Sequence, residues 1–300
     1  MQSIDYSKIS ITAKLVAYFR QFSDIPFAQD VAGFVRAEEA LHEIASLMEK
    51  EDDKQIKLNE TVDQVNVYAP LLESRYKSIV QVILKTGIKQ VLELASGYSL
   101  RGLAMSQDKD ISYVESDLSG VNEEKCKLIE ALRAKYDLID FGNYQTVTAN
   151  ALERSDLVSA TAHLKRDQPL AVVNEGLLLY LTAEERSTLA RNVRYLLGQF
   201  AGGAWITPDF TTRQLSDEVS EHRKRLRKAI IGATEREVHV AAFDSEQSIS
   251  DFVGEHGFTG TCSYQTDEVT NLVSPERLGL SSKVVERLKP HMRIWLLSPQ

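Results

Sequence analysis

The pattern of apolar and polar positions changes near Gly87. Before that residue, apolar side chains recur at helical spacing, as at Leu15, Phe19 and Phe22, and a helix is predicted from about Pro70 to Gly87. After it, short apolar runs alternate with amphipathic segments, which is typical of βαβ units around a parallel sheet. The pattern therefore predicts an α/β protein with helices at its N-terminal end.

Five strand candidates follow in this alternating order, and two more lie near the end of the chain. They are KQVLELA, ISYVESDL, YQTVTANA, PLAVVNEGLLLYL, GGAWITPDF, FTGTCSYQT and HMRIWLLSP. After the fourth, Thr182 and Glu185 have the spacing of a capping box at the start of a helix. The last two strands are expected to pair like a hairpin. We thus expect a seven-stranded, mainly parallel sheet with helices on both faces.

The same pattern divides a single domain, residues 1–300, into four parts. These are a helical cap (1–68), a ligand-binding core (69–210), a helical insertion (211–254) and C-terminal strands (255–300). The insertion holds a basic run, HRKRLRK, from His222 to Lys228. This run is either a solvated helix face or a site for an anionic partner.

Composition narrows the class of protein. A net charge of -8 argues against a general nucleic-acid-binding protein, which needs a basic face. Cys126 and Cys262 lack the spacing of a zinc site or a disulfide framework, so no metal is expected and a reducing compartment is favoured. The N-terminus shows no signal pattern, and no apolar run reaches the roughly 18 residues of a membrane span. We therefore expect a cytoplasmic protein without membrane association.

Polar residues at the ends of the predicted strands indicate where a ligand binds, because open parallel sheets bind ligands at the carboxyl ends of their strands. Strand one ends in Glu93 and Gly97, and the next three end in Asp117, Asn150 and Glu175. The loop ASGYSL lacks the glycines of a dinucleotide fingerprint, and a carboxylate at Glu93 would repel a pyrophosphate. Carboxylates instead suit the sulfonium, amino group and ribose hydroxyls of S-adenosylmethionine.

Each of these residues also has a simpler interpretation. Gly97 could serve only a turn, and Asp117 could be a helix cap or a solvated carboxylate. Glu175 is harder to explain in this way, since a carboxylate in an apolar strand is costly unless it is paired. Tyr180 is either an aromatic wall of the site or a core residue with a satisfied hydroxyl.

Three stretches, VLELASGYSLRGL, YVESDLSGVNEEK and VVNEGLLLYLTAEE, resemble in order and spacing the leucine carboxyl methyltransferase family. The N-terminal TAKLVAYFRQFSDIPFA resembles the leading helix of that family. The family includes eukaryotic enzymes that methylate the C-terminal leucine of protein phosphatase catalytic subunits, and bacterial O-methyltransferases associated with polyketide-type products. The first motif departs from the family pattern, because Ala95 and Ser96 replace Gly-Ala and Ser99-Leu100-Arg101 replaces Asp-Thr-Arg.

The resemblance implies a Rossmann-like class I methyltransferase that uses S-adenosylmethionine. It implies that Lys14 contacts the cofactor and that Arg75 pairs with the cofactor carboxylate. It further places Asp117 at the ribose, Glu175 near the methionine amino group and Asn150 near adenine. The expected cofactor-binding residues are Lys14, Arg75, Glu93, Ala95, Gly97, Asp117, Leu118, Asn150, Ala151 and Glu175, and the candidate catalytic residue is Tyr180.

The predicted activity is methyl transfer to a carboxylate or hydroxyl of a small molecule, by a monomer or homodimer. No histidine lies in the first four strand-end loops, which favours an acceptor that is already ionised, since a carboxylate needs no general base. Three alternatives stay open at this point. They are a methyltransferase for a protein C-terminal carboxyl group, a family member that binds the cofactor without catalysis, and a nicotinamide oxidoreductase.

Overall fold

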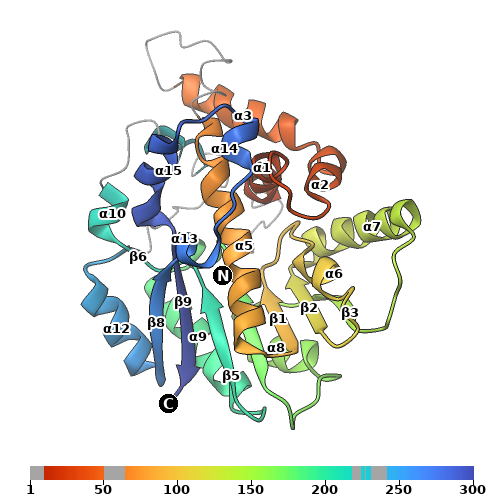
Figure 1. Cartoon of the computed structure of the whole chain (residues 1–300). Coiled ribbons are helices and arrows are strands. Elements are labelled where there is room, and N and C mark those ends of the chain that lie inside the picture. Colours follow the sequence, from red (N-terminus) through yellow and green to blue (C-terminus); the bar gives the residue numbers. More distant parts are fainter. Residues whose placement is uncertain (1–9, 51–64, 218–223, 227, 231–241) are drawn as a thin grey trace.

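The structure, a computed structural model, describes residues 10–50, 65–217, 224–226, 228–230 and 242–300 (Figure 1). Parts of the predicted insertion lie outside these ranges. Of the basic run, Lys224, Arg225 and Lys228 are helical, and His222, Arg223 and Arg227 are outside the described residues.

The centre of the molecule is a seven-stranded sheet with the order β3-β2-β1-β4-β5-β9-β8. The pairs from β3 to β5 are all parallel, whereas β9 runs antiparallel to both β5 and β8. The strands are β1 (Gln90–Leu94), β2 (Ser112–Asp117), β3 (Tyr144–Thr148), β4 (Leu170–Asn174), β5 (Gly203–Thr207), β8 (Phe258–Tyr264) and β9 (Arg293–Pro299). All seven predicted strands are present, and the predicted terminal pair is confirmed as a β8–β9 ladder.

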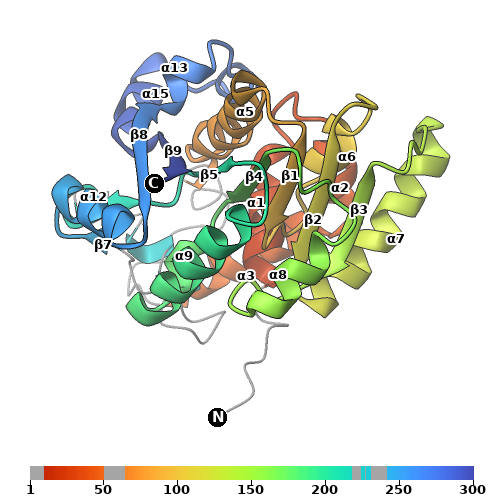
Figure 2. The same cartoon turned by 90° about the horizontal axis from the view of Figure 1, so that it is seen from below.

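Helices cover both faces of the sheet, because alternate residues of the central strands point to opposite sides. Val91 and Val173 belong to one buried cluster, and Leu92 and Val172 belong to the other. The first cluster packs against α5 (Ala69–Thr86), α6 (Arg101–Met105) and α7 (Ser119–Tyr136). The second packs against α8 (Arg154–Ala160), α9 (Ala183–Leu197) and α12 (Glu246–Glu255). Figure 2 shows α8 and α9 on the opposite side of the sheet from α5.

Two predicted helix boundaries are confirmed by their backbone geometry. Helix α5 has a proline in its first turn and ends at Gly87, which takes the left-handed conformation with φ 70°. Helix α9 starts with a capping box in which Thr182 accepts the N–H of Glu185 and the Glu185 side chain accepts the N–H of Thr182.

The N-terminal helical pattern forms three described helices, which with later segments cover one end of the sheet. They are α1 (Ser10–Arg20), α2 (Ala28–Phe34) and α3 (Ala37–Lys50). The chain reverses between them at Phe27 and Arg36, with φ of 63° and 53°. From the C-terminal part come α13 (Gln265–Glu268), α14 (Ser274–Arg277) and α15 (Ser282–Leu288), and α13 and α14 pack on α5. We call α1, α2 and α3 the cap helices.

Residues 211–254, predicted as a helical insertion, contain two short strands as well as helices. They form a short parallel pair, β6 (Thr211–Thr212) with β7 (Ala242–Phe243), together with α10 (Arg213–Asp217). Pairs of two residues are too short to produce a recognisable alternation in the sequence.

Candidate active site

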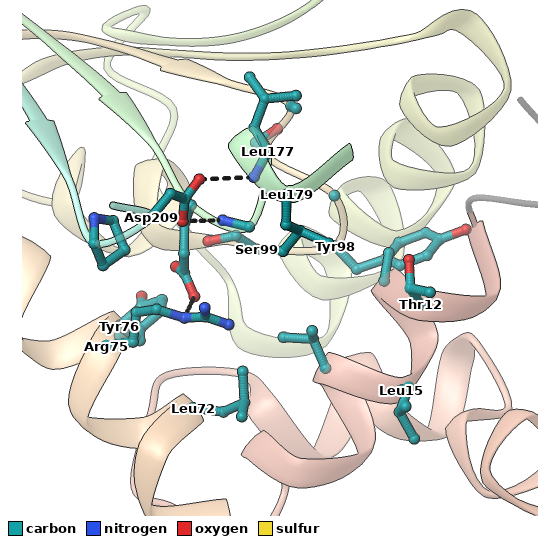
Figure 3. A pocket seen from close by; sticks show the side chains of 18 of the residues that line it. Thr12, Leu15, Leu72, Arg75, Tyr76, Tyr98, Ser99, Leu177, Leu179 and Asp209 are labelled. Carbon is teal, nitrogen blue, oxygen red and sulfur yellow. Dashed lines mark hydrogen bonds and ion pairs between the residues drawn. The ribbon is translucent and has the colours of Figure 1, made fainter. Parts of the chain in front are cut away.

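A cavity of about 500 Å³ lies at the carboxyl ends of the central strands, bordered by α1, α2 and α5 (Figure 3). Its lining includes Asp117, the last residue of β2, and Gly97, Asn150, Glu175 and Asp209, which follow β1, β3, β4 and β5 respectively. The volume is in the range of sites that hold small organic ligands. The predicted strand-end residues, including Glu93, are therefore brought together around one cavity.

The loop that follows β1, residues 95–99, is held in an unusual backbone conformation. We call it the β1 loop. Gly97 has φ 53°, and a Cβ built there would contact the Ala13 Cβ at 3.4 Å. Ala95 has φ 49°, a left-handed conformation that is unfavourable for a residue with a Cβ. The glycine-poor loop thus adopts a glycine-like path, and the strain falls on Ala95.

Asp117 closes this loop from the end of β2. Its carboxylate accepts the N–H of Gly97 at 2.6 Å and the N–H of Leu118 at 2.8 Å, one on each oxygen. Burial raises the pKa of Asp117, while the two N–H donors lower it. Each oxygen keeps a further lone pair, so the carboxylate can still accept hydrogen bonds from ligand hydroxyls.

Asn150 and Ala151 line the cavity after β3. The Asn150 side-chain oxygen accepts the N–H of Leu152 at 3.0 Å, and the Asn150 N–H donates to Asp156 at 2.9 Å. The amide therefore fixes its own turn, and its oxygen retains one lone pair toward a ligand. The adenine contact of Asn150 stays a prediction.

Glu93 does not act as the free carboxylate that the sequence suggested. It borders the cavity, but Arg101 donates to its Oε1, and the Tyr113 hydroxyl donates to its Oε2 at 2.7 Å. The charge of Glu93 is therefore compensated, and the expectation that it would repel a pyrophosphate is wrong. Of the features of the β1 loop, only its missing glycines then disfavour a bound dinucleotide. Arg101, eight residues further along the chain, supplies this charge from α6.

Glu175 lies among three arginines. Its Oε1 accepts from Arg20 and from the Nε–H of Arg75 at 3.1 Å, and its Oε2 accepts from Arg101 at 2.5 Å. Burial alone would raise the pKa of Glu175, but the positive charges of Arg20, Arg101 and Arg75 lower it to about 2. Together with Glu93, the cluster contains three positive and two negative charges. This end of the cavity therefore favours one additional anionic group.

Tyr180 lines the cavity, whereas Lys14 does not. Tyr180 lines the cavity at the end of η2 (Leu178–Tyr180), and burial raises the pKa of its hydroxyl despite a hydrogen bond with the Thr12 side chain. At neutral pH the phenol is therefore protonated. Lys14 is on α1, but the residues of that helix that line the cavity are its neighbours, such as Ala13 and Val16. The structure does not bring Lys14 to the cavity wall.

Asp209, in the segment after β5, was missed by the sequence analysis. Its Oδ2 accepts from the Asn174 side chain and from the N–H groups of Leu177 and Leu178, and its Oδ1 accepts the N–H of Gly176. The contact with Leu177 is drawn in Figure 3. Burial raises the pKa of Asp209, while the positive charge of Arg75 and the backbone N–H donors of Gly176, Leu178 and Leu177 lower it. With four donors the carboxylate is engaged in shaping the loop that carries Glu175. The available signal was an acid directly after the fifth strand.

Arg20 and Tyr76 were also missed. Both line the cavity, and the guanidinium groups of Arg20 and Arg101 lie 5.1 and 4.5 Å from the centre of the Tyr76 ring. An aromatic ring at this distance stabilises the two cations that are buried against it. In sequence, both residues are ordinary members of amphipathic helices, so no local pattern marks them.

Two further properties of the described residues bear on function. None of the described helices is both long and apolar enough to cross a membrane. Within the same ranges, no three or more His, Cys, Asp or Glu side chains are grouped in a way that could hold a metal ion.

Solved methyltransferase structures are similar to this chain, and the first of the three below supports the fold. A candidate methyltransferase from Thermobifida fusca is 14% identical, with a TM-score of 0.51 over 86% of this chain and 94% of that one. A candidate O-methyltransferase from Nostoc punctiforme is 12% identical, with a TM-score of 0.48 over 78% of this chain and 60% of the other. Magnesium protoporphyrin IX methyltransferase from Synechocystis, solved with S-adenosylhomocysteine, is 14% identical, with a TM-score of 0.46 over 83% and 90%. The chain matches none of the curated proteins with which it was compared.

The family model described as leucine carboxyl methyltransferase matches residues 18–194, which is more than half of the chain. The matched range includes the β1 loop, Asp117 and Glu175, which line the cavity. It confirms the resemblance drawn from the three quoted stretches, and with it the Rossmann-like class I fold and S-adenosylmethionine as the cofactor of the family. This chain belongs to the leucine carboxyl methyltransferase family and is an S-adenosylmethionine-dependent methyltransferase.

Proposed function

We propose that the enzyme transfers a methyl group to a carboxylate or hydroxyl oxygen of a small, largely apolar molecule. The observation that carries this proposal is the composition of the single cavity around Asp117 and Glu175. One end holds charged and polar strand-end residues, and the other is walled by apolar side chains. These two environments suit a polar cofactor and an apolar acceptor that meet within one cavity.

The polar residues fit S-adenosylmethionine. Asp117 can accept the ribose hydroxyls, and the left-handed Gly97 leaves room for close approach of the backbone to the ligand. Leu118, Asn150 and Ala151 border the place where the base would lie. The cofactor supplies an electrophilic methyl group on a sulfonium centre, and the residues of the protein bind and orient both reactants.

Arg75 is the best partner for the methionine carboxylate. Among the described residues it hydrogen-bonds through its Nε to Glu175, which leaves its terminal nitrogens for a ligand (Figure 3). A carboxylate bound there would also compensate the surplus positive charge of the arginine cluster. A planar guanidinium with two parallel N–H donors is well suited to such a group. Lys14 is not needed for this contact.

The acceptor end of the cavity is formed mainly by the cap helices and α5. Its side chains are apolar, and an acceptor with an aliphatic or aromatic body would be bound there by burial of its apolar surface. The lining residues on this side include Leu15, Phe19, Ile25, Leu72, Leu226 and Ile230.

A carboxylate acceptor fits the residues next to this wall best. The Tyr180 hydroxyl stays protonated at neutral pH, and Asp209 is engaged by four donors, so neither is a suitable general base. An ionised carboxylate needs no base to attack the methyl group. A hydroxyl acceptor would require one, and His291, which lines the cavity, would be the candidate.

Two experiments test the proposal. Calorimetry with S-adenosylhomocysteine should give micromolar affinity for the wild type and at least about tenfold weaker affinity for Asp117→Asn, since a lost hydrogen bond to a charged group costs about 1.5–3 kcal/mol. Asp251→Asn, an exposed change on α12, serves as the matched control. Equal affinity of the wild type and Asp117→Asn would reject the proposed site.

The acceptor class is tested with radiolabelled S-adenosylmethionine and a library of apolar acids and phenols. A methyl ester releases labelled methanol in mild alkali, whereas a methyl ether does not. Label in the alkali-labile fraction would support a carboxylate acceptor. Label that is stable to alkali, together with loss of transfer in His291→Gln, would support a hydroxyl acceptor.

A further inference from the structure

The β1 loop rests on a buried ion pair that the proposed chemistry does not use. Lys125 on α7 and Glu115 on β2 are 1% and 0% exposed, and their Nζ and Oε2 atoms are 2.7 Å apart. A buried pair of this kind often adds little to stability, because its desolvation offsets the attraction between the charges. The contacts of this pair with the β1 loop and with α6 indicate a role other than stability.

Lys125 reaches the β1 loop directly. Its Nζ donates to the Ser96 Oγ at 2.8 Å. The Ser96 hydroxyl in turn donates to the Ser116 carbonyl oxygen at 3.2 Å, and the Ser96 N–H donates to the same oxygen at 3.0 Å. Ser96 is one of the residues that depart from the family pattern, and Lys125 satisfies the polar group that this departure introduces.

Glu115 connects the same ion pair to the next turn of the chain. Its Oε1 accepts the N–H of Gly102 at 2.6 Å, and its Oε2 accepts the Tyr144 hydroxyl at 2.9 Å. A Cβ at Gly102 would lie 2.9 Å from the Glu115 Oε1, so only glycine allows this approach. The β1 loop is thus fixed at Ser96 by Lys125, and α6, which follows the loop, is fixed at Gly102 by Glu115.

The loop held in this way contains the residues assigned above to the cofactor. Gly97 follows Ser96 directly and donates its N–H to Asp117. Asp117 lies two residues beyond Glu115 on the same strand. A shift of Ser96 away from β2 would therefore change the position of Gly97 relative to Asp117.

We propose that Lys125 is a positioning residue for the cofactor, which holds the β1 loop against β2 through Ser96, with Glu115 as its buried counter-ion. This inference rests on the proposed function, because it takes the β1 loop and Asp117 as the cofactor site. A loop that is fixed before binding need not be ordered by the ligand, and binding is stronger for that reason.

The test separates positioning from stability with a neutral replacement of both charges. In Lys125→Met/Glu115→Gln the volumes are kept and an acceptor remains for Gly102 or Tyr144. We expect a midpoint of thermal unfolding close to that of the wild type, and a Kd for S-adenosylhomocysteine that is about 5- to 30-fold higher. Hydrogen exchange of the amides of residues 95–99 should be faster in the double variant. Lys135→Met, which removes an exposed lysine paired with Asp30, is the control for loss of a lysine charge on α7.

A serine variant keeps the test valid if the double variant does not fold. Ser96→Ala removes the acceptor of Lys125, and a rise of the Kd by about 3- to 10-fold is expected. Ser106→Ala, at another buried serine hydroxyl, should leave the Kd unchanged. If the double variant folds, adding Ser96→Ala to it should raise the Kd by less than in the wild type, since both changes break the Lys125–Ser96 contact and only the hydroxyl bond to Ser116 remains to be lost.

The outcomes distinguish this inference from the proposed function. If wild-type protein does not bind S-adenosylhomocysteine, the proposed cofactor site is wrong. If the wild type binds it and the Kd is unchanged in Ser96→Ala and in the double variant, the cofactor site stands and the role of Lys125 is refuted. Additive effects of Ser96→Ala and the double variant would likewise refute the link between the two residues.

Discussion

Arg101 and Glu93 form an ion pair in which the two side chains are 0% and 1% exposed to solvent. The same guanidinium also donates to Glu175, so one arginine links the end of β1 with the end of β4. The floor of the cavity is consequently held together by charges that have almost no access to water.

Removal of this arginine is predicted to destabilise the fold strongly. In Arg101→Met, the Glu93 carboxylate would stay buried without its counter-ion, and the free energy of unfolding should fall by about 3–5 kcal/mol in urea denaturation. Arg133→Met breaks the exposed pair with Asp140, and about 1 kcal/mol or less should be lost there. Similar losses in the two variants would contradict the prediction.

Glu175 is predicted to make stability depend on acid pH. Its pKa is lowered from 4.5 to about 2 in the folded protein, so its ionised form stabilises the fold fully above about pH 4.5. That contribution is lost as the pH falls toward 2. Between pH 6 and pH 3 the wild type should lose about 2 kcal/mol through this group, and Glu175→Gln should not show this component. The measurement is urea denaturation at both pH values, and identical pH dependence of the two proteins would refute it.

Glycine and alanine substitutions in the β1 loop should change the stability of the fold differently at Ala95 and at Gly97. Ala95→Gly relieves the left-handed strain, and we expect unchanged stability or a gain of up to about 1 kcal/mol, since the added freedom of the unfolded chain offsets part of the relief. Gly97→Ala imposes that strain and should cost about 1–2 kcal/mol. Thermal unfolding measures both. Ala104→Gly, within α6, is the control and should cost up to about 1 kcal/mol.

Much of the fold follows from local pattern, whereas the charge pairing of the site does not. The seven strands, the cap at Thr182 and the end of α5 at Gly87 are determined by residues close together in the sequence. Strand ends also indicated the edge of the sheet that binds a ligand. Arg20 and Glu175, however, are 155 positions apart, and no spacing rule relates them. Glu93 was misjudged for the same reason, because its partner on α6 becomes visible only when the chain is folded.

Arg75 is predicted to discriminate between ligands with and without the amino-acid part of the cofactor. In Arg75→Met the Kd for S-adenosylhomocysteine should rise by about tenfold or more, because a charge-assisted hydrogen bond to the carboxylate is lost. The Kd for methylthioadenosine, which lacks that carboxylate, should change little. Calorimetry with both ligands provides the comparison. Equal weakening of both would show that Arg75 affects binding through the structure of the site and not through the cofactor carboxylate.

Asp209 is predicted to hold the site in shape without taking part in proton transfer. Asp209→Asn replaces an acceptor of four donors by an amide whose NH₂ group would face N–H donors. We expect a loss of about 1–3 kcal/mol in stability and weaker cofactor binding, with an unchanged pH profile of the remaining methyl transfer. A shift of that pH profile would instead indicate that Asp209 takes part in proton transfer.

The position of Arg20 at the last residue of α1 has a consequence for attempts to redesign this enzyme. The helix that forms part of the proposed acceptor wall also contributes one of the three cations around Glu175. A chimaera that exchanges the cap helices for those of a relative, in order to change the acceptor, would therefore also alter the electrostatics of the proposed cofactor site. Such a graft should retain an arginine at position 20, because under the proposed assignment the same helix serves both the choice of acceptor and the binding of the donor.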